Sequence, residues 1–184
     1  MNLNQKEVSG IMYTADKNTE IVLPMLNEVV ERYTQDLETV MKGIYLDVVN
    51  VEDPDINVIE KYFVKLSNTL YFVCSNTEYL AMYDGIAKAG YKEAYNNSLL
   101  RVNDNVDKAN KKTVAEATAI AEADNIHEQV VSDIYNKAYK IVKAKIESAQ
   151  TMVSTLSKVL SKRMSEQNLA NSVRDTAPDE NVFR

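Results

Sequence analysis

The chain has 184 residues, of which 45% are hydrophobic and 26% charged, and these proportions exclude a chain that is disordered throughout. Its net charge of −6 argues against indiscriminate binding to phosphate, which needs an excess of Lys and Arg on the binding surface. Its single cysteine, Cys74, excludes an internal disulfide and a cysteine-rich zinc site and is expected to be a core thiol.

No apolar run approaches the roughly 20 residues that a membrane-spanning helix needs, and the N-terminus lacks the basic and apolar stretches of a signal peptide. We therefore expect a cytoplasmic protein. Only four glycines and three prolines interrupt the chain, whereas a sheet-containing domain of this size needs many turn residues. The sequence predicts an all-α fold.

The first predicted helix covers residues 19–42. It opens at Thr19, includes Pro24 in its first turns, and ends at Gly43. It is acidic, because the first 60 residues contain twelve acidic and four basic side chains. Its apolar positions keep helical spacing. They are Ile21, Met25, Leu26, Val29, Val30, Tyr33, Leu37, Val40 and Met41.

A second helix is predicted from Ile56 to about Asn97, with Asp55 placed to cap its N-terminus. Its apolar residues follow the 3-4 alternation of a coiled-coil seam that two polar positions interrupt. The predicted seam is Ile59, Phe63, Leu66, Leu70, Val73, Thr77, Leu80, Asp84, Ala87, Tyr91 and Ala94. Such a helix is about 60 Å long at 1.5 Å per residue, and a compact globule of this size has a radius of gyration near 16 Å. We therefore expect the helix to protrude or to pack against other chains.

Residues 96–112 are rich in Asn and Asp, whose side chains compete with helical hydrogen bonds, and they predict a connection. Thr113 and Glu116 have the spacing of a capping box. A third helical region is expected from there to about Asn171, with a break near 123–127. Its apolar stripe consists of Val131, Ile134, Tyr135, Ala138, Val142, Ala149, Met152, Val153, Leu156 and Leu160.

These elements predict an elongated, coiled-coil-like helical hairpin that forms homo-oligomers. The expected parts of the chain are an acidic N-terminal helical segment at 1–50 and the long hairpin core at 51–172. A polar tail at 173–184 carries Pro178 and is expected to be loose.

Residues that could carry catalysis are scarce. His127 is the only histidine, and a lone His without a nucleophile or ligand spacing is usually an exposed or helix-flanking residue. The sequence has no Walker loop, no GxGxxG and no calcium loop. Glu116 and Glu122 do not share a helix face. We expect no enzymatic activity, no cofactor and no metal site.

One face of the third helical region is basic. Lys137, Lys140, Lys158 and Lys162 lie within about 60° of one another on a helical wheel, opposite the apolar stripe. The segment 137–163 contains seven basic residues and one acidic residue. This strip is either the solvated back of an amphipathic helix or a surface that contacts phosphates without reading bases.

The stretch "YLAMYDGIAKAGYKEAYNN" at 79–97 pairs tyrosines four apart twice, with two lysines among them. The pairs are Tyr79 with Tyr83 and Tyr91 with Tyr95, and the lysines are Lys88 and Lys92. Side chains four apart on a helix touch, so each pair forms either a hydrophobic ladder with wet phenol ends or a platform for the bases of single-stranded nucleic acid. Tyr91, Lys92 and Tyr95 have the spacing for stacking, and both interpretations stay open.

The order of these features resembles the phage UvsY-type recombination mediators over roughly residues 56–168. In that family the second helix ends in an aromatic and basic stretch, to which "GYKEAYNN" is similar. The last helix of the family is similar to "YKIVKAKIESAQTMVSTLSKVLSKRM". This chain departs from the family in its negative net charge, its longer N-terminal extension and the lack of a glycine-containing basic loop after the second helix.

The resemblance implies an oligomeric helical protein that binds single-stranded DNA and helps to load a RecA-type recombinase while displacing single-strand-binding protein. Carried over by position, the DNA surface would include Lys88, Lys92 and Arg101, with Lys108, Lys111 and Lys112 in the connection, beside the tyrosines Tyr91 and Tyr95.

Two other functions are compatible with the sequence. A structural or assembly protein, such as a phage virion or scaffold component, would use the helical seams for self-association without nucleic acid, and the acidic first sixty residues favour it. A helical adaptor would bind another protein through the tyrosines and would neither bind DNA nor assemble.

Overall fold

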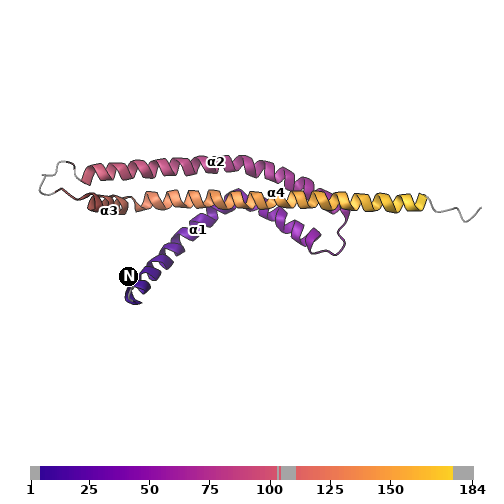
Figure 1. The fold of residues 1–184 in the computed structure, drawn as a ribbon, viewed down its shortest axis with the longest axis horizontal. Helices are drawn as coiled ribbons and strands as arrows, with labels where there is room; N and C mark the ends of the chain where they lie inside the picture. The colour runs from indigo at the N-terminus through magenta and orange to yellow at the C-terminus, as the bar shows by residue number, and fades with distance from the viewer. Residues whose placement is uncertain (1–4, 103, 105–110, 176–184) are drawn as a thin grey trace, which may run out of the picture. The chain divides into compact units, whose positions relative to one another are not determined.

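All regular secondary structure in the part of the chain that the structure describes is helical. The computed structural model describes residues 5–102, 104 and 111–175 (Figure 1). The elements are α1 (Gln5–Ile44), the π-helical turn η1 (Tyr45–Val49), α2 (Ile56–Val102), α3 (Val114–Asp124) and α4 (Ile126–Asp175). The predicted all-α fold is therefore confirmed, whereas most of the predicted tail at 173–184 lies outside the described residues.

Helix α1 is longer than the predicted helix at 19–42. It begins at Gln5, so that Pro24 lies inside the helix and not in its first turns. Proline has no backbone N–H, and the carbonyl four residues earlier, at Glu20, loses its partner within the helix. The predicted start was wrong because Thr and Pro, which often occur at the beginning of a helix, can also lie inside a longer one, as Thr19 and Pro24 do here.

Gly43 also lies inside α1, whereas the sequence placed it beyond the end of the helix. A Cβ atom at this position would be 2.6 Å from the hydroxyl of Tyr62 and 2.9 Å from Tyr62 Cε1. The glycine therefore permits α2 to approach α1 closely through this ring. Tyr62 in turn donates a hydrogen bond to the carboxylate of Asp47 in η1.

Helix α2 begins where the sequence predicted and continues for about one turn beyond Asn97. The carboxylate of Asp55 accepts a hydrogen bond of 2.8 Å from the backbone N–H of Asn57, which confirms Asp55 as the N-cap. The first residues of the predicted connection at 96–112 are helical, up to Val102. The Asn residues at positions 96 and 97 therefore do not end the helix, and the connection is shorter than predicted.

The predicted capping box and the predicted helix break are both present. Thr113 accepts a hydrogen bond from the N–H of Glu116, and the Glu116 carboxylate accepts one from the N–H of Thr113. The break falls at Asn125, between α3 and α4. The buried Asn125 amide donates to the carbonyl of Ala121 at 2.7 Å and to the hydroxyl of Ser98 in α2 at 2.9 Å. This side chain stabilises the turn where the helix is interrupted.

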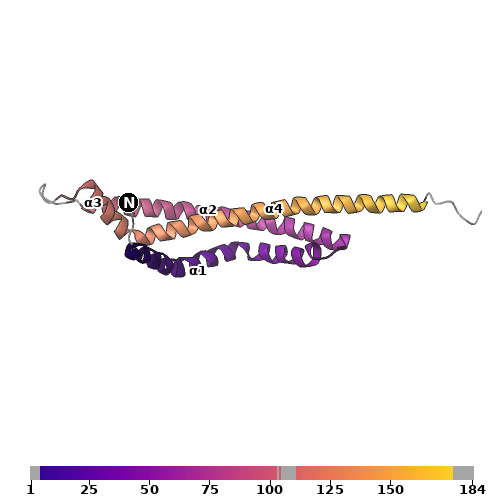
Figure 2. The same ribbon diagram turned by 60° about the horizontal axis from the view of Figure 1, so that its bottom comes forward.

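The chain forms two compact units, each of which includes segments of α1, α2 and α4. Unit 1 consists of residues 1–34 and 74–144, and unit 2 of residues 35–73 and 145–184. In unit 1, α2 and α4 lie side by side and antiparallel (Figures 1 and 2), because Asp84 contacts Asn136 whereas the later Ser98 contacts the earlier Asn125. The division into 1–50, 51–172 and 173–184 stays a prediction.

The core of unit 2 is apolar. It is formed by Leu37, Val40 and Ile44 of α1, Ile59, Leu66, Leu70 and Val73 of α2, and Ile146, Ala149 and Leu156 of α4. On its surface, Lys145 pairs with Glu38, and Arg163 pairs with Asp53 in the segment before α2. These ion pairs join α4 to two different parts of the same unit.

The core of unit 1 is smaller and partly polar. Its buried apolar residues are Leu26, Val30, Leu80, Ala117, Ala121, Ile134, Ala138 and Val142. Its buried polar residues are Thr34, Thr77, Asp84, Asn125 and Ser132. Within the described residues, every buried polar side chain of the protein belongs to this unit.

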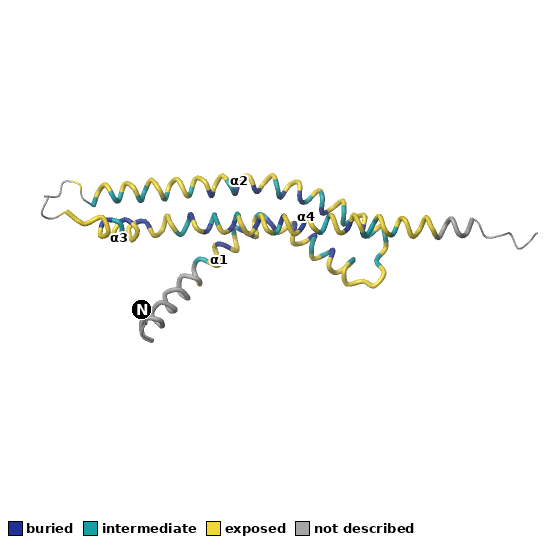
Figure 3. The backbone as a smooth tube through the Cα atoms, in the orientation of Figure 1, coloured by how far each residue is buried: buried dark blue, intermediate teal, exposed yellow. Residues whose placement is uncertain are grey.

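The predicted faces of α2 and α4 are confirmed, and burial alternates along both helices (Figure 3). In the α2 seam, positions from Ile59 to Asp84 are buried, except for the half-buried Phe63, and the positions from Ala87 onward are half-buried. The seam is thus covered by helices of the same chain, and the expectation that one chain cannot cover it was wrong. In α1, Met25 keeps the helical spacing of the apolar positions but is 53% exposed.

Candidate nucleic-acid interface

Four of the predicted DNA-binding residues share one face of α2 in unit 1. Lys88, Tyr91, Lys92 and Tyr95 follow one another at spacings of three, one and three residues, and residues three and four apart are neighbours on a helix surface. Arg101 is six residues further along, or about 240° around the helix axis, and points elsewhere. Helical geometry therefore assembles a tyrosine and lysine surface but does not add Arg101 to it.

The rings of Tyr91 and Tyr95 lie next to each other. Their centroids are 6.1 Å apart and the ring planes are inclined by 44°. Both side chains are half-buried, because this face of α2 continues the core seam toward the end of unit 1, where the core thins out. Each ring is thus partly packed against the protein and partly accessible to a ligand.

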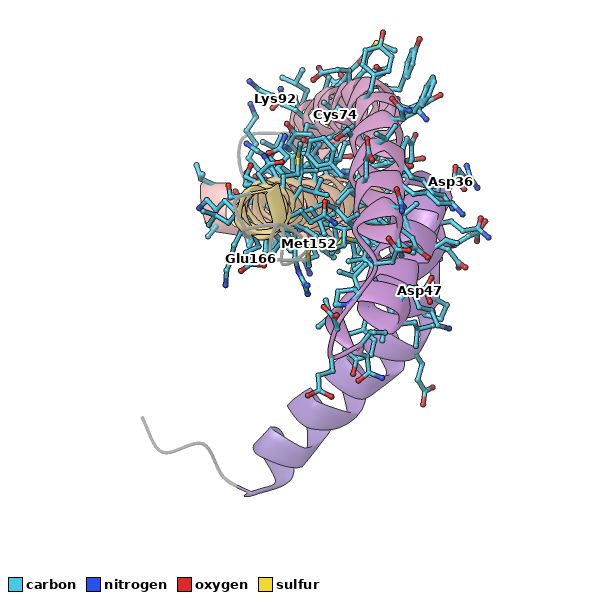
Figure 4. All side chains as sticks on the ribbon, turned by 90° about the vertical axis from the view of Figure 1, so that its right-hand side faces the viewer. Asp36, Asp47, Cys74, Lys92, Met152 and Glu166 are labelled. Carbon is cyan, nitrogen blue, oxygen red and sulfur yellow. The ribbon has the colours of Figure 1, made fainter. Side chains whose placement is uncertain are left out.

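The two lysines beside the rings differ in their surroundings. Lys88 donates to the carboxylate of the buried Asp84 at 2.6 Å, although its side chain is still half exposed. Asp84 also accepts a hydrogen bond of 3.3 Å from the amide of Asn136 in α4. The side chain of Lys92 extends outward from α2 (Figure 4) and is exposed. Lys88 is thus partly neutralised, whereas Lys92 faces solvent.

The remaining predicted cations lie at or beyond the end of α2. Arg101 is exposed in the last turn of α2, where a cation interacts favourably with the carbonyl end of the helix. Lys111 and Lys112 are exposed just before the cap of α3. Lys108 lies outside the described residues.

The two members of the other tyrosine pair, Tyr79 and Tyr83, have different surroundings. Tyr83 stacks on Tyr135 of α4, with ring centroids 5.9 Å apart. Tyr33 of α1 is close to both, and burial, followed by the neighbouring Tyr83, raises the pKa of its phenol above the ordinary value. Tyr79, in contrast, is 61% exposed. Tyr83 therefore helps to pack α1, α2 and α4 in unit 1.

The predicted basic strip of α4 is exposed. In unit 1 it consists of Lys137 and Lys140, and in unit 2 of Lys158 and Lys162. Lys162 lies 3.8 Å from Glu166 on the same helix. This arrangement is that of a solvated helix back, and it also leaves the amines accessible to phosphates.

A surface that the sequence reasoning missed lies on α2, opposite its core seam. We call it the outer face of α2. Its exposed residues are Val64, Asn68, Tyr71 and Phe72 in unit 2, and Ser75, Tyr79, Met82 and Ile86 in unit 1. The rings of Tyr71 and Phe72 contact each other edge to face at 5.4 Å. In the sequence these residues form a second series with intervals of three and four, on the side of the helix opposite the core seam.

Unit 2 contains an open pocket of about 400 Å³ beside the N-terminus of α2. Its lining residues are Asp53, Pro54, Asp55, Ile56, Arg163, Glu166 and Gln167. Arg163 is paired with Asp53, and Asp55 caps α2, so these polar groups already have structural partners. Within the described residues, no three His, Cys, Asp or Glu side chains are grouped to hold a metal ion.

The two other residues that the sequence singled out have ordinary environments. His127 is exposed in the first turn of α4. Cys74 is half-buried, so the expected core thiol was only partly correct.

None of the described helices is long and apolar enough to cross a membrane. Comparison with protein-family models gives no match, and neither a curated protein nor a solved structure is significantly similar to the chain.

Proposed function

We propose that the protein binds single-stranded DNA through the C-terminal part of α2 and acts as a recombination mediator. In this role it assists the loading of a RecA-type recombinase on DNA that is covered by single-strand-binding protein. The observation that carries the proposal is the partly accessible ring pair of Tyr91 and Tyr95, which shares one face of α2 with Lys88 and Lys92.

This face has the chemistry of a sequence-independent single-strand site. Bases stack on aromatic rings whatever their identity, and lysines contact the phosphates. The face contains no arginine, whose guanidinium would be needed for bidentate reading of bases. From Lys88 to Tyr95 it is only about 10 Å long, so tight binding would require several copies on one strand.

The test is the affinity of the full chain for a labelled oligonucleotide, measured by fluorescence anisotropy over a range of salt concentrations. Replacing Lys88 and Lys92 with Ala should lower the salt slope by about 1.4, at roughly 0.7 per phosphate contact. Tyr91→Ala and Tyr95→Ala should each weaken binding by about 1–3 kcal/mol if bases stack there. Because both rings are half-buried, the thermal stability of each variant must be measured alongside.

A matched control is the double Ala variant at Lys137 and Lys140, which are exposed on α4 in the same unit. It removes the same charge, so an equal fall in salt slope would mean that net charge or the basic strip of α4, and not the α2 face, determines binding. A Tyr91→Ala protein that melts much earlier, while its folded fraction binds DNA unchanged, would contradict stacking. The mediator role itself requires that the protein speed the recombinase's ATP hydrolysis on strands covered by single-strand-binding protein.

A specific observation favours a second function, that of a structural or assembly protein. The outer face of α2 exposes large apolar side chains, and the exposed charged residues Lys65 and Glu78 lie at its edges. Contiguous apolar patches of this kind usually mark interaction surfaces. An assembly protein would self-associate but would not retard a single-stranded oligonucleotide at low salt, whereas a mediator would.

A further inference from the structure

The segment that joins α1 to α2 within unit 2 exposes large apolar side chains. We call residues 45–55 the α1–α2 connection, which consists of η1 and the bend that follows it. Tyr45 and Val49 are each 58% exposed, Leu46 is 51% exposed and Val51 is 42% exposed. Connecting segments are usually polar, and the exposed apolar residues of a protein are ordinarily scattered singly. Four of them within seven residues therefore mark an interaction surface.

Polar contacts fix the backbone of the connection. The N–H of Asn50 donates to the carbonyl of Tyr45 at 2.9 Å and closes the π-helical turn. Asp47 accepts a hydrogen bond from Tyr62 of α2, and Asp53 forms an ion pair with α4. A π-helical turn is rare in proteins and is frequently found at functional sites. Because the connection is held in place before a ligand arrives, binding there costs little conformational entropy.

The charges of the connection are all negative. From Gly43 to Glu60 the sequence contains five acidic residues and no basic residue. All five are exposed, and within the described residues only Asp53 among them forms an ion pair. The carboxylate of Glu52, beside the apolar Val51, is therefore accessible to an external cation. Such a surface repels the phosphates of nucleic acids and of anionic lipids, and it attracts Lys and Arg side chains.

The apolar and acidic groups together define the chemistry of the occupant. The four exposed apolar residues present on the order of 400 Å², about half of the roughly 800 Å² that each partner contributes to a standard interface. This area suits a short segment better than a whole globular face. We propose that the α1–α2 connection is a docking surface for a short basic, amphipathic segment of a partner protein.

In this arrangement the apolar side chains of the segment cover those of the connection, and its Lys and Arg side chains lie against the surrounding carboxylates. The apolar contacts supply most of the affinity, and the charges add specificity and a faster encounter. The docking surface belongs to unit 2, whereas the proposed DNA-binding face of α2 belongs to unit 1. Failure of either proposal therefore leaves the other standing.

The first experiment selects ligands for the full chain from random peptides of about 12 residues displayed on phage. The library is first depleted on the variant Leu46→Ser/Val49→Ser, so that the peptides that remain need the apolar part of the connection. We expect the enriched peptides to carry more Lys and Arg than Asp and Glu, with apolar residues three or four positions apart. Both replaced residues are exposed, and far-UV circular dichroism and thermal melting check that the variant is folded.

The second experiment measures the affinity of one selected, fluorescently labelled peptide by anisotropy at low salt. Leu46→Ser/Val49→Ser should raise its dissociation constant at least about tenfold, as expected for the centre of an interface. Glu52→Gln/Glu60→Gln should raise it about threefold, and this difference should shrink as salt is added.

Matched control variants change the same kinds of side chain at other exposed positions. Met82→Ser/Ile86→Ser removes comparable apolar area in unit 1, where the two residues are 57% and 60% exposed. Glu28→Gln/Glu31→Gln removes the same charge from the exposed surface of α1. Neither control should change the dissociation constant of the peptide.

Each outcome bears directly on the proposal. Basic, amphipathic peptides whose affinity depends on the connection and not on the control positions would support it. A selection that enriches no peptide, or that enriches acidic ones, would overturn it, as would an equal loss of affinity in the controls. A wild-type mass well above 20.8 kDa that falls to this value in Leu46→Ser/Val49→Ser would instead assign the surface to a second copy of the chain.

Discussion

Tyr62 of α2 contacts two earlier parts of unit 2, the end of α1 and the π-helical turn. Its ring lies where a side chain on Gly43 would otherwise be, and its hydroxyl donates to Asp47 in the π-helical turn. That hydrogen bond, and to a lesser degree burial, raise the pKa of the Tyr62 phenol above its ordinary value. Because the neutral phenol is favoured in the folded state, this contribution to stability is complete below the ordinary tyrosine pKa and is lost as pH rises through the raised one.

Gly43→Ala should separate Tyr62 from Asp47. The new methyl group would overlap the phenol, so the ring must move, and the Tyr62 pKa should fall toward its ordinary value. The gain in helix propensity, about 1 kcal/mol, opposes the lost contact, so the change in overall stability should be small. The measurement is an NMR titration of ¹³C-labelled tyrosine.

Gly85→Ala and Gly90→Ala are the matched controls. No atom lies within 4 Å of a Cβ built at either position. Each should stabilise the protein by about 1 kcal/mol and leave the Tyr62 titration unchanged. An unchanged Tyr62 titration in Gly43→Ala would mean that the ring accommodates the methyl group without losing its hydrogen bond.

At the scale of the element, α3 depends on its N-terminal cap. The helix has 11 residues, and its buried residues are the small Ala117 and Ala121, so packing contributes little. Hydrogen bonds from the backbone N–H of Thr113, and then from its hydroxyl, lower the pKa of Glu116. A lowered carboxyl pKa stabilises the helix above the ordinary glutamate pKa, and this stabilisation is lost as pH falls through the lowered value.

Thr113→Ala should destabilise α3 by about 1 kcal/mol through loss of the cap. Glu116→Gln should remove the acid-dependent part of this stability, so that the protection factors of the α3 amides no longer fall between mildly acidic and strongly acidic solution. Hydrogen exchange of the Ala117 amide, which donates to the Thr113 carbonyl at 2.9 Å, is a direct measure. Glu122→Gln, exposed in the same helix, is the control, and an equal effect there would exclude the capping box as the cause.

The sequence predicted those elements whose signals are local and periodic. The seam of α2 was recognised together with its polar positions Thr77 and Asp84, because periodicity specifies a face whatever residue occupies it. The start of α1 was missed, since a single proline is compatible with either a first turn or an interior position. The role of Gly43 was missed because it depends on Tyr62, nineteen residues away, and no local rule contains that contact.

The candidate site was predictable only in part. Helical spacing alone places Lys88, Tyr91, Lys92 and Tyr95 on one face. It does not show that the rings are half-buried, or that Asp84 engages Lys88, because both depend on how α4 packs against α2. The outer face was not predicted because residue spacing alone does not show which of two stripes on a helix the neighbouring helices cover.

At the scale of the whole molecule, the two units differ in what their cores are made of. Among the described residues, unit 2 buries only apolar side chains, whereas unit 1 buries five polar ones and several alanines. A buried polar group gains less from burial than an apolar one even when it is hydrogen-bonded. Unit 1 is therefore expected to open more readily than unit 2.

Native-state hydrogen exchange followed by mass spectrometry checks this difference. Amides of α2 between 77 and 95 should exchange faster than those between 59 and 73, although both belong to the same helix. Replacing Asp84 and Asn136 together with Leu should slow exchange in unit 1, because both members of a polar pair are replaced by apolar side chains of similar size. Equal protection along α2 would mean that the two units open together.

The aromatic packing in unit 1 has a practical consequence for optical spectroscopy. The chain has no tryptophan, so tyrosines dominate its near-ultraviolet signal, and Tyr33, Tyr83 and Tyr135 are grouped from α1, α2 and α4. Rings held in a fixed asymmetric environment give a near-ultraviolet dichroic band that disappears when tertiary packing is lost, even while helices persist. The protein thus carries an intrinsic reporter of the packing of unit 1, readable without a label beside the far-ultraviolet band of its helices.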